Sequence, residues 1–406
     1  MAPVFATTPE IPSHIPAELI RRFDINNDPE VLADPWAAID RLREDSPLLW
    51  SPELGGYWIA TTADLVREVY QTWEIFGSYP IGLPAFEGAW PRKLNPIELD
   101  GDEHTRYRRL LTPLFSPRAV RPLADSVRER ATKMIAAFAD ADRVEFLGQL
   151  AFPLPSSVFL DLFGIPAEQA ETFFSWVSDL LHSGDPETAA AAGGTIVGYL
   201  SETVAQRMRQ PADDMISALA QMEVEGRPLT AEEMLDISYL LFLAGLDTVS
   251  NQLSVITLHL ARNTEQQRAL RADPSLIDGA LEELLRLYPI VPVVRTLSRD
   301  YVLNGVQLKK GDKVLACSMG ATRDPAAFGD PAEAKFDRAE NWTTAFGLGP
   351  HRCVGMHLAR QELRIVLELM TTLAPPFRLA PGARWQWHTA GNVWGLDRLD
   401  LEFVRD

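Results

Sequence analysis

The sequence is poor in cysteine, because only Cys317 and Cys353 occur in 406 residues. Two cysteines cannot build a disulfide framework or a multi-cysteine zinc or iron–sulfur site, and their scarcity is typical of a reducing compartment. Basic residues are also in deficit: 38 Lys and Arg stand against 56 Asp and Glu, and the formal net charge is −18. Nucleic-acid binding needs a basic surface, so we expect no nucleic-acid partner.

Long apolar runs and targeting signals are missing as well. The first residues show no basic region followed by an apolar stretch, so we expect no secretory signal. The densest apolar stretch, residues 240–246, ends at Asp247, far short of the roughly 20 residues of a membrane span. With no internal repeat and no low-complexity linker, we expect one cytoplasmic domain over residues 1–406, without contact to a membrane.

The spacing of apolar residues predicts a mostly α-helical protein with small β-sheets. Residues 56–62 are aromatic and β-branched and predict a strand, while Asn304-Gly305 and residues 309–312 each predict a hairpin turn. Thr230 and Glu233 form a capping-box pattern, which opens a helix that reaches about residue 261, or about 50 Å at 1.5 Å per residue. Its middle is apolar on all sides and should be buried.

The most informative segment is residues 346–360, Phe-Gly-Leu-Gly-Pro-His-Arg-Cys-Val-Gly-Met-His-Leu-Ala-Arg. Gly347 and Gly349 predict a tight turn, and helix-forming residues follow Cys353, so we expect this cysteine at the start of a helix. That position favours a thiolate, and a thiolate on a Gly-rich loop is suited to ligate a haem iron. Cys317 lies in a strand-like segment, where we expect a buried and inert thiol.

This loop resembles the haem-thiolate loop of the cytochrome P450 family, Phe-Gly-x-Gly-x-His-x-Cys-x-Gly followed by Leu-Ala-Arg. The resemblance implies a P450 fold that holds haem b between a long distal helix and the helix after the cysteine loop, with Cys353 as the iron ligand. It implies that four cationic side chains bind the haem propionates: His104, Arg108, Arg295 and His351. It also implies a buried structural charge network: Glu283, Arg286 and Arg338.

Residues 244–248, Ala-Gly-Leu-Asp-Thr, resemble the oxygen-activation segment of the family. A carboxylate in an apolar helix costs free energy unless it has partners, and a threonine hydroxyl can bond back to a carbonyl and loosen the helix. Gly245 should remove bulk that would block a groove. The resemblance implies that Thr248 positions a water for proton delivery and that Asp247 relays protons from solvent. The alternative is an Asp-Thr pair that only forms a salt bridge with another element.

Apolar residues should line the substrate side of the haem: Leu240, Leu243, Ala244, Val291 and Val293. Such a wall predicts a small hydrophobic substrate held mainly by shape, although similar stripes also occur in ordinary cores. The spacings most resemble soluble bacterial members that hydroxylate camphor and related terpenoids. Arg92, in the Pro-rich loop of residues 80–96, falls near the position of a camphor-binding tyrosine, and Val293 replaces an acid. The substrate could therefore be a norisoprenoid, or a monoterpene other than camphor.

No flavin or iron–sulfur segment occurs in the sequence, so the resemblance implies electrons from a separate acidic [2Fe-2S] ferredoxin that a flavin reductase reduces. Residues 104–133 contain eight basic and two acidic residues, a surplus of six positive charges. We expect this basic segment, together with Arg109, Arg352 and Arg360, to form the ferredoxin-binding face of a monomer. A scattered and solvated set of charges is the alternative.

These features predict a haem-thiolate monooxygenase that uses O2 to hydroxylate a small terpenoid-like or norisoprenoid-like substrate. Two alternatives stay open. One is a peroxygenase that takes its oxidant from hydrogen peroxide, against which the Asp247-Thr248 pair and the basic segment argue. The other is a haem sensor or carrier that performs no turnover, although the sequence contains nothing that resembles an output domain.

Overall fold

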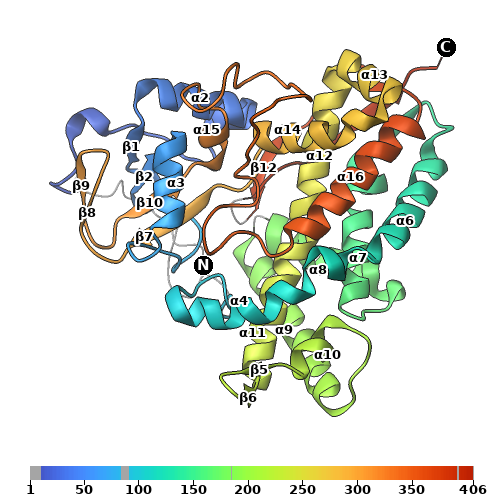
Figure 1. Ribbon diagram of the computed structural model, residues 1–406, viewed down its shortest axis with the longest axis horizontal. Helices are drawn as coiled ribbons and strands as arrows, with labels where there is room; N and C mark the ends of the chain where they lie inside the picture. Colours follow the sequence, from blue (N-terminus) through green and yellow to red (C-terminus); the bar gives the residue numbers. More distant parts are fainter. Residues whose placement is uncertain (1–10, 84–90, 184, 391–392, 406) are drawn as a thin grey trace.

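The computed structural model describes residues 11–83, 91–183, 185–390 and 393–405. A helical part lies beside a smaller part built on a five-stranded sheet (Figure 1). The mostly α-helical architecture with small sheets is as predicted. In chain order the main helices are α1 (Pro29–Ala33), α2 (Pro35–Asp45), α3 (Ala63–Gln71), α4 (Gly101–Leu114), α5 (Pro117–Val120), α6 (Leu123–Phe138), α7 (Pro153–Leu162), α8 (Ala170–His182), α9 (Pro186–Arg209), α10 (Met215–Ala220), α11 (Ala231–Leu246), α12 (Thr248–Arg262), α13 (Thr264–Ala272), α14 (Ile277–Leu287), α15 (Ser318–Thr322) and α16 (Met356–Thr372).

The largest sheet joins strands that are far apart in the sequence. Its order is β1 (Leu48–Ser51), β2 (Tyr57–Ala60), β10 (Lys313–Ala316), β7 (Val293–Leu297) and β3 (Phe76–Gly77), with β2 and β10 parallel and the other pairs antiparallel. The smaller sheets are β11 (Phe377–Leu379) with β14 (Asp400–Phe403) and β4 (Arg143–Glu145), β12 (Trp387–Ala390) with β13 (Val393–Leu396), β5 (Glu223–Val224) with β6 (Arg227–Pro228), and β8 (Tyr301–Leu303) with β9 (Val306–Leu308).

Turn chemistry places two of these strands as predicted. Residues 56–62 contain β2, and Asn304 and Gly305 join β8 to β9 with φ angles of 50° and 74°, the left-handed conformation that a tight hairpin needs. Residues 309–312 also form a turn, but the prediction of a second hairpin there is wrong, because β10 pairs with β7 and β2. The Asp312 carboxylate accepts a hydrogen bond from the Trp58 indole of β2 (3.0 Å), which directs the chain into the large sheet.

The long central helix begins as predicted and is interrupted once. The Thr230 and Glu233 capping box is present, but α11 ends at Leu246 and α12 begins at Thr248. The Thr248 hydroxyl donates to the Ala244 carbonyl at 2.9 Å, a bond that competes with the helical pattern. By length and composition residues 231–262 could cross a bilayer, unlike the expectation from the sequence, but 67% of their most apolar window is buried in the protein.

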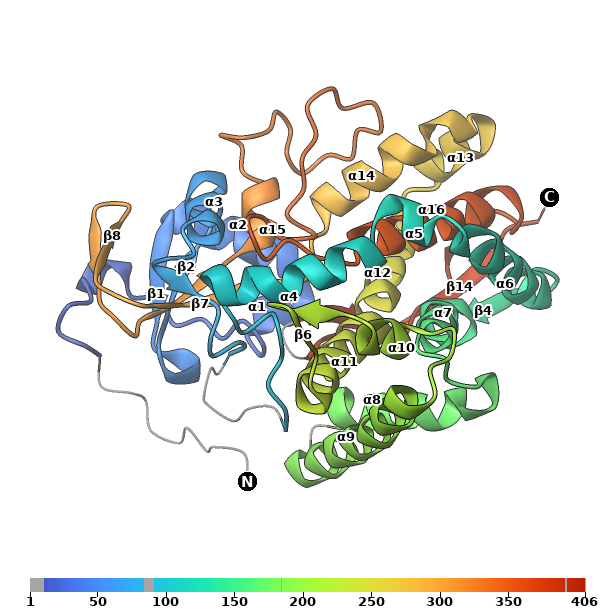
Figure 2. The same cartoon turned by 60° about the horizontal axis from the view of Figure 1, so that its bottom comes forward.

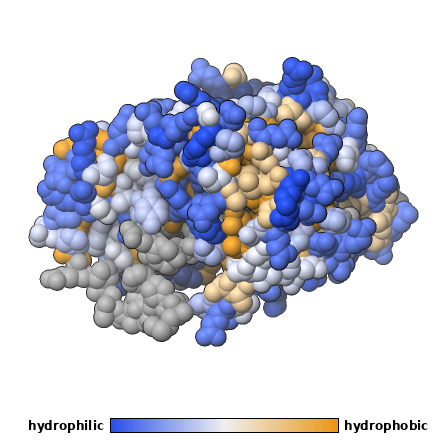
Figure 3. Space-filling view, turned by 90° about the horizontal axis from the view of Figure 1, so that it is seen from below, coloured by the Kyte–Doolittle hydropathy of each residue, from blue (hydrophilic) through white to orange (hydrophobic). Residues whose placement is uncertain are grey.

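These two helices organise the rest of the fold around them. Helix α12 packs between α16 and β13, and α11 packs against α7 and α9. Helices α8 and α9 lie side by side at the bottom of Figure 2. The face seen from below is mainly hydrophilic, with apolar side chains visible in an area at its centre (Figure 3). The α11–α12 interruption therefore lies deep in the molecule, in reach of α16 and the loop before it.

Candidate active site

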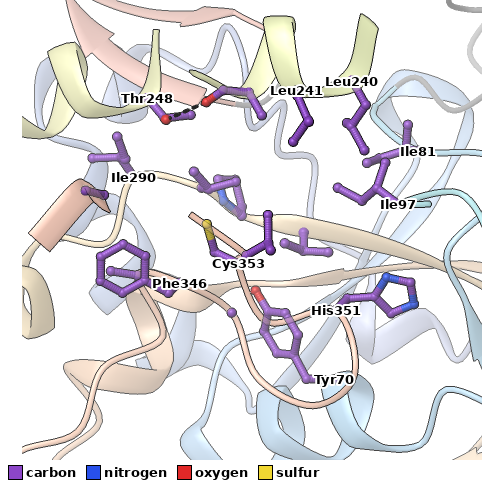
Figure 4. Close-up of a pocket in the computed structure, with 18 of the residues that line it drawn as sticks. Tyr70, Ile81, Ile97, Leu240, Leu241, Thr248, Ile290, Phe346, His351 and Cys353 are labelled. Carbon is purple, nitrogen blue, oxygen red and sulfur yellow. Dashed lines mark hydrogen bonds between the residues drawn. The ribbon is translucent and has the colours of Figure 1, made fainter. Parts of the chain in front are cut away.

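A cavity of about 290 Å³ lies between the α11–α12 interruption and the loop that carries Cys353 (Figure 4). Side chains from α3, α4, β7 and the segment before β7 complete its walls. Cys353 lies on one side and Thr248 on the other. The cavity therefore brings together residues that are more than 100 positions apart in the sequence.

Glycines shape the cysteine loop by allowing close approach to α3. Gly347 and Gly349 have φ angles of 66° and 69°, and a Cβ at Gly349 would lie 2.6 Å from the Tyr70 carbonyl oxygen. The Cys353 amide donates to the Phe346 carbonyl at 2.8 Å and closes the loop. Helix α16 begins only at Met356, so the expectation that Cys353 starts a helix is wrong by three residues.

The Cys353 thiol therefore lacks a helix N-terminus beside it, but a backbone amide and several arginines lie near it instead. The Cys353 side chain is exposed to the cavity, yet the surrounding protein desolvates its thiol and raises its pKa, whereas the Gly355 amide and the charges of three arginines lower it: Arg108, Arg360 and Arg352. Bound metal ions deprotonate coordinating thiols, and these groups stabilise the resulting negative charge. Cys317, in contrast, is fully buried, and burial raises the pKa of its thiol to about 12.

The four residues expected at the propionates all line this cavity: His104, Arg108, Arg295 and His351. The His104 and His351 rings lie 4.1 Å apart. Burial, and then the charges of His351 and Arg108, lower the pKa of His104 to about 4. Arg295 is only 4% exposed, and its guanidinium donates to the Val294 carbonyl at 3.0 Å. Within the described ranges, neither Arg108 nor Arg295 has a carboxylate at ion-pair distance.

Residues that the sequence did not single out complete this edge. His351 Nε2 lies 3.0 Å from Asp100 Oδ1 and 3.0 Å from Ser78 Oγ. Burial opposes ionisation of Asp100, but hydrogen bonds from His351 and Ser78 outweigh it and lower the pKa of the carboxyl. Asp100 precedes α4, where an ordinary N-cap would be predicted, yet its side chain makes no cap bond. The sequence position of Asp100 before a helix thus suggests a capping role, whereas its side chain binds His351 and Ser78 instead.

The polar atoms on this edge fit haem b. A buried cation without a counterion, such as Arg295, is costly, and a haem propionate would compensate it, as a second would pair with the partly buried Arg108. The Tyr70 hydroxyl and His351 Nδ1 are buried and have no hydrogen-bond partner in the described part of the chain, so they too can bind a ligand. The accessible thiol of Cys353 is a ligand that haem iron accepts.

The acid and the alcohol at the helix interruption have separate surroundings. Thr248 lines the cavity, whereas Asp247 is 4% exposed and its Oδ2 accepts a hydrogen bond from Asn251 Nδ2 at 2.7 Å. The expectation that Gly245 opens a groove toward the cavity is wrong. A Cβ there would lie 2.1 Å from the Phe159 ring of α7, so the missing side chain permits close helix packing instead.

Four of the five residues expected in the substrate wall line the cavity: Leu240, Ala244, Val291 and Val293. Leu243 does not, and Leu241 takes its place. Ala244 faces the cavity, and at about 100° per residue Leu243 is turned 100° from it, whereas Leu241 is turned only about 60°. The sequence also missed Ile81 and Ile97, which come from the irregular segments before α4 (Figure 4).

The expected charge network is assembled and buried. Glu283 and Arg286 are both fully buried, and Arg286 Nε donates to Glu283 Oε2 at 2.8 Å. Arg338 Nε donates to Glu283 Oε1 at 2.9 Å. Arg286 also donates to the carbonyls of Thr322 (2.6 Å) and Pro331 (2.9 Å). The network thus ties α14 to the irregular segment before the cysteine loop.

The basic face is smaller than the count of charges predicts. Several of its cations have carboxylate partners: Arg106 with Glu225, Arg128 with Glu368, Arg130 with Asp161, Lys133 with Glu129 and Arg360 with Glu282. Arg109 and Arg352 have no ion pair among the described residues, and Arg109 lies beside Pro350 of the cysteine loop in a surface groove. The Arg360 expectation is therefore weakened by its bidentate bond to Glu282.

Arg92 also has a partner outside the cavity. Its guanidinium lies 2.6 Å from Asp236 of α11, so it joins the loop after residue 90 to the central helix. Residues 84–90 of the predicted Pro-rich loop lie outside the described residues.

The chain is similar to several known proteins in sequence and in fold. Residues 172–372 match the sequence model of the family described as Cytochrome P450. The chain is 36% identical to a "Probable cytochrome P450 127A1" of Sinorhizobium fredii over 98% of both chains, and 28% identical to a steroid C26-monooxygenase of Mycobacterium tuberculosis over 91% of both. The crystal structure of CYP101J2 has a TM-score of 0.90 and 32% identity and covers 98% of this chain and 100% of its own. That of CYP101C1 has 0.89 and 34% with the same coverage.

Proposed function

Because the chain belongs to the cytochrome P450 family, we propose that it is a ferredoxin-dependent enzyme that hydroxylates a small hydrophobic compound. Membership makes it a monooxygenase that carries haem b, and the predicted P450 fold is confirmed. One observation carries the proposal. The Cys353 thiol and the Thr248 hydroxyl line the same cavity, and so do the cations Arg108 and Arg295, which have no carboxylate at ion-pair distance among the described residues.

In this proposal each wall of the cavity has a separate task. Cys353 ligates the iron, while His104, Arg108, Arg295 and His351 bind the propionates. When bound, haem activates O2 and supplies the oxidising chemistry. Thr248, at the cavity wall, holds a water at hydrogen-bond distance. The buried Asp247 relays protons from solvent to this water.

Cys353→Ala tests the thiolate assignment. The reduced, carbon monoxide-treated protein should show the red-shifted Soret band of a haem thiolate, and the variant should lose it. Cys317→Ala is the matched control and should keep the band, because this thiol is buried away from the cavity. A variant at Cys353 that keeps the band would refute the assignment.

The substrate is proposed to be a terpenoid or norisoprenoid. The support is the aliphatic wall, to which Leu240, Leu241, Ile81 and Ile97 contribute. The similarity to steroid C26-monooxygenases makes a steroid the second candidate. A titration of the Soret band with terpenoids, norisoprenoids and steroids distinguishes them, because only a compound that enters beside the iron changes its spin state. A response to steroids alone would overturn the terpenoid proposal.

Electrons are proposed to arrive from an acidic [2Fe-2S] ferredoxin at Arg109 and Arg352, in a cytoplasmic and monomeric enzyme. Exposed charges without partners contribute most to steered association. Arg109→Glu with Arg352→Glu should slow ferredoxin-driven reduction and weaken its salt dependence. Lys309→Glu, at the β9–β10 turn, is the control. Unchanged reduction would contradict the proposal, and turnover with hydrogen peroxide but not with ferredoxin would favour a peroxygenase.

A further inference from the structure

The Asp247 carboxylate depends on a side chain one helical turn away. Asn251 donates from Nδ2 to Asp247 Oδ2 at 2.7 Å, and both residues are only 4% exposed. A carboxamide is planar, so its nitrogen cannot keep this direction if its oxygen is displaced. Whatever fixes Asn251 Oδ1 therefore also fixes the donor that faces Asp247.

The other end of the Asn251 carboxamide lies against the C-terminal hairpin. A Cβ built on Gly395 of β13 would lie 1.9 Å from Asn251 Oδ1 and 2.5 Å from Asn251 Cγ. The same position is 2.9 Å from the ring of His388, the residue opposite Gly395 on β12. Gly395 does not have a left-handed φ angle, so any residue could adopt its backbone conformation. Glycine is needed here for space and not for conformation.

The hairpin strand itself is fixed beside this contact. The Trp394 amide donates to the Ile290 carbonyl at 2.9 Å, and Ile290 lines the cavity. The Trp394 and Leu396 side chains are each 1% exposed. Because its neighbours on both sides are buried, Gly395 cannot move away from α12 without disturbing the core.

From this contact we infer that Gly395 and Asn251 are positioning residues for the Asp247 carboxylate. The missing side chain at Gly395 leaves room for the Asn251 carboxamide oxygen beside β13, while the NH2 group donates to Asp247. The hairpin thereby controls proton delivery without touching the reacting atoms. This inference rests on the proposed role of Asp247, and the experiment below separates the two.

Three variants are compared with Gly198→Ala, a helical glycine with open space around its α-carbon. Asp247→Asn should lower the product formed per O2 consumed by about 10²-fold, within the range for lost general acids. Asn251→Ala and Gly395→Ala should each lower it by about tenfold, because small misplacements of catalytic groups have effects of up to about 10²-fold. The lost product should appear as peroxide, with an altered solvent isotope effect, while the substrate-induced Soret shift stays unchanged.

The double variant decides whether Gly395 acts through Asn251. Without the carboxamide an alanine methyl at position 395 loses its closest contacts, so Gly395→Ala in the Asn251→Ala background should lower neither coupling nor the unfolding midpoint further. Additive effects would overturn the inference, because alanine would then act through the strand. If Asp247→Asn uncouples the enzyme and the other two variants do not, the inference fails and the role of Asp247 stands. If Asp247→Asn has no effect, the proposed role itself fails.

Discussion

Replacing Glu362 with glutamine should stabilise the protein at neutral pH and not in acid. Glu362 lies on α16 with 2% of its surface exposed, and its Oε2 has no hydrogen-bond partner among the described residues. Burial alone raises the pKa of this carboxyl from 4.5 to about 8. At pH 7 the folded protein therefore keeps a proton that the unfolded chain has released.

The magnitude follows from proton linkage. Between pH 4.5 and about 8 the unfolded chain binds fewer protons than the folded protein, so stability falls as pH rises, by about 1.4 kcal/mol per unit. At pH 7 the protein has therefore lost about 3 kcal/mol of the stability that a protonated Glu362 allows below pH 4.5. Glutamine avoids it but buries an amide whose donors need partners, which costs about 1 kcal/mol. The variant should gain about 2 kcal/mol at pH 7, and the two stability curves should cross at about pH 5.

Denaturant unfolding of both proteins from pH 4 to pH 8 measures this difference. Glu368→Gln on the same helix is the control with the opposite sign. Its carboxylate accepts two hydrogen bonds from Arg128, which lower the pKa of Glu368, so its contribution is present at neutral pH and lost in acid. A stability difference for Glu362→Gln that does not change with pH would refute the argument. The difference would then come from packing or hydrogen bonding and not from the ionisation of Glu362.

Three further changes test the packing around the site, each measured as the change in unfolding free energy. Arg286→Leu leaves Glu283 buried with one cation fewer and should cost about 3 kcal/mol, whereas an unchanged value would mean that Arg338 alone suffices. Gly245→Ala places a methyl group against Phe159 and should cost about 1–3 kcal/mol, less in a Phe159→Leu background. Thr230→Ala removes the capping box and should cost about 1 kcal/mol; no loss would show that packing alone holds the start of α11.

The sequence predicted those features that depend on local chemistry. The capping box at Thr230, the Asn304-Gly305 turn and the glycine turns of the cysteine loop need particular residues at fixed spacing. They are therefore visible without any knowledge of distant contacts. The interruption at Asp247 was foreseen as a local loosening, but not as the end of a helix, because the sequence does not say how far one side-chain bond outweighs helix continuity.

Features that depend on distant partners were missed or misplaced. Gly245 permits contact with Phe159, which is 86 positions away, and nothing near Gly245 identifies that partner. Asp100 has the sequence surroundings of a helix cap, yet its partner His351 lies on another element. Arg360 was expected on the ferredoxin-binding face, and its carboxylate partner, Glu282, lies 78 positions away. Charge counts along a segment cannot reveal such compensation.

The buried guanidinium of Arg295 affects the stability of the protein before haem binds. A guanidinium with 4% exposure and no carboxylate partner in the described structure makes the empty chain less stable than the loaded one. Cofactor that binds only the folded chain then shifts the folding equilibrium in proportion to its supply. A cell short of haem would hold more of this chain unfolded and exposed to proteases, so its abundance should follow haem biosynthesis even at a constant rate of translation.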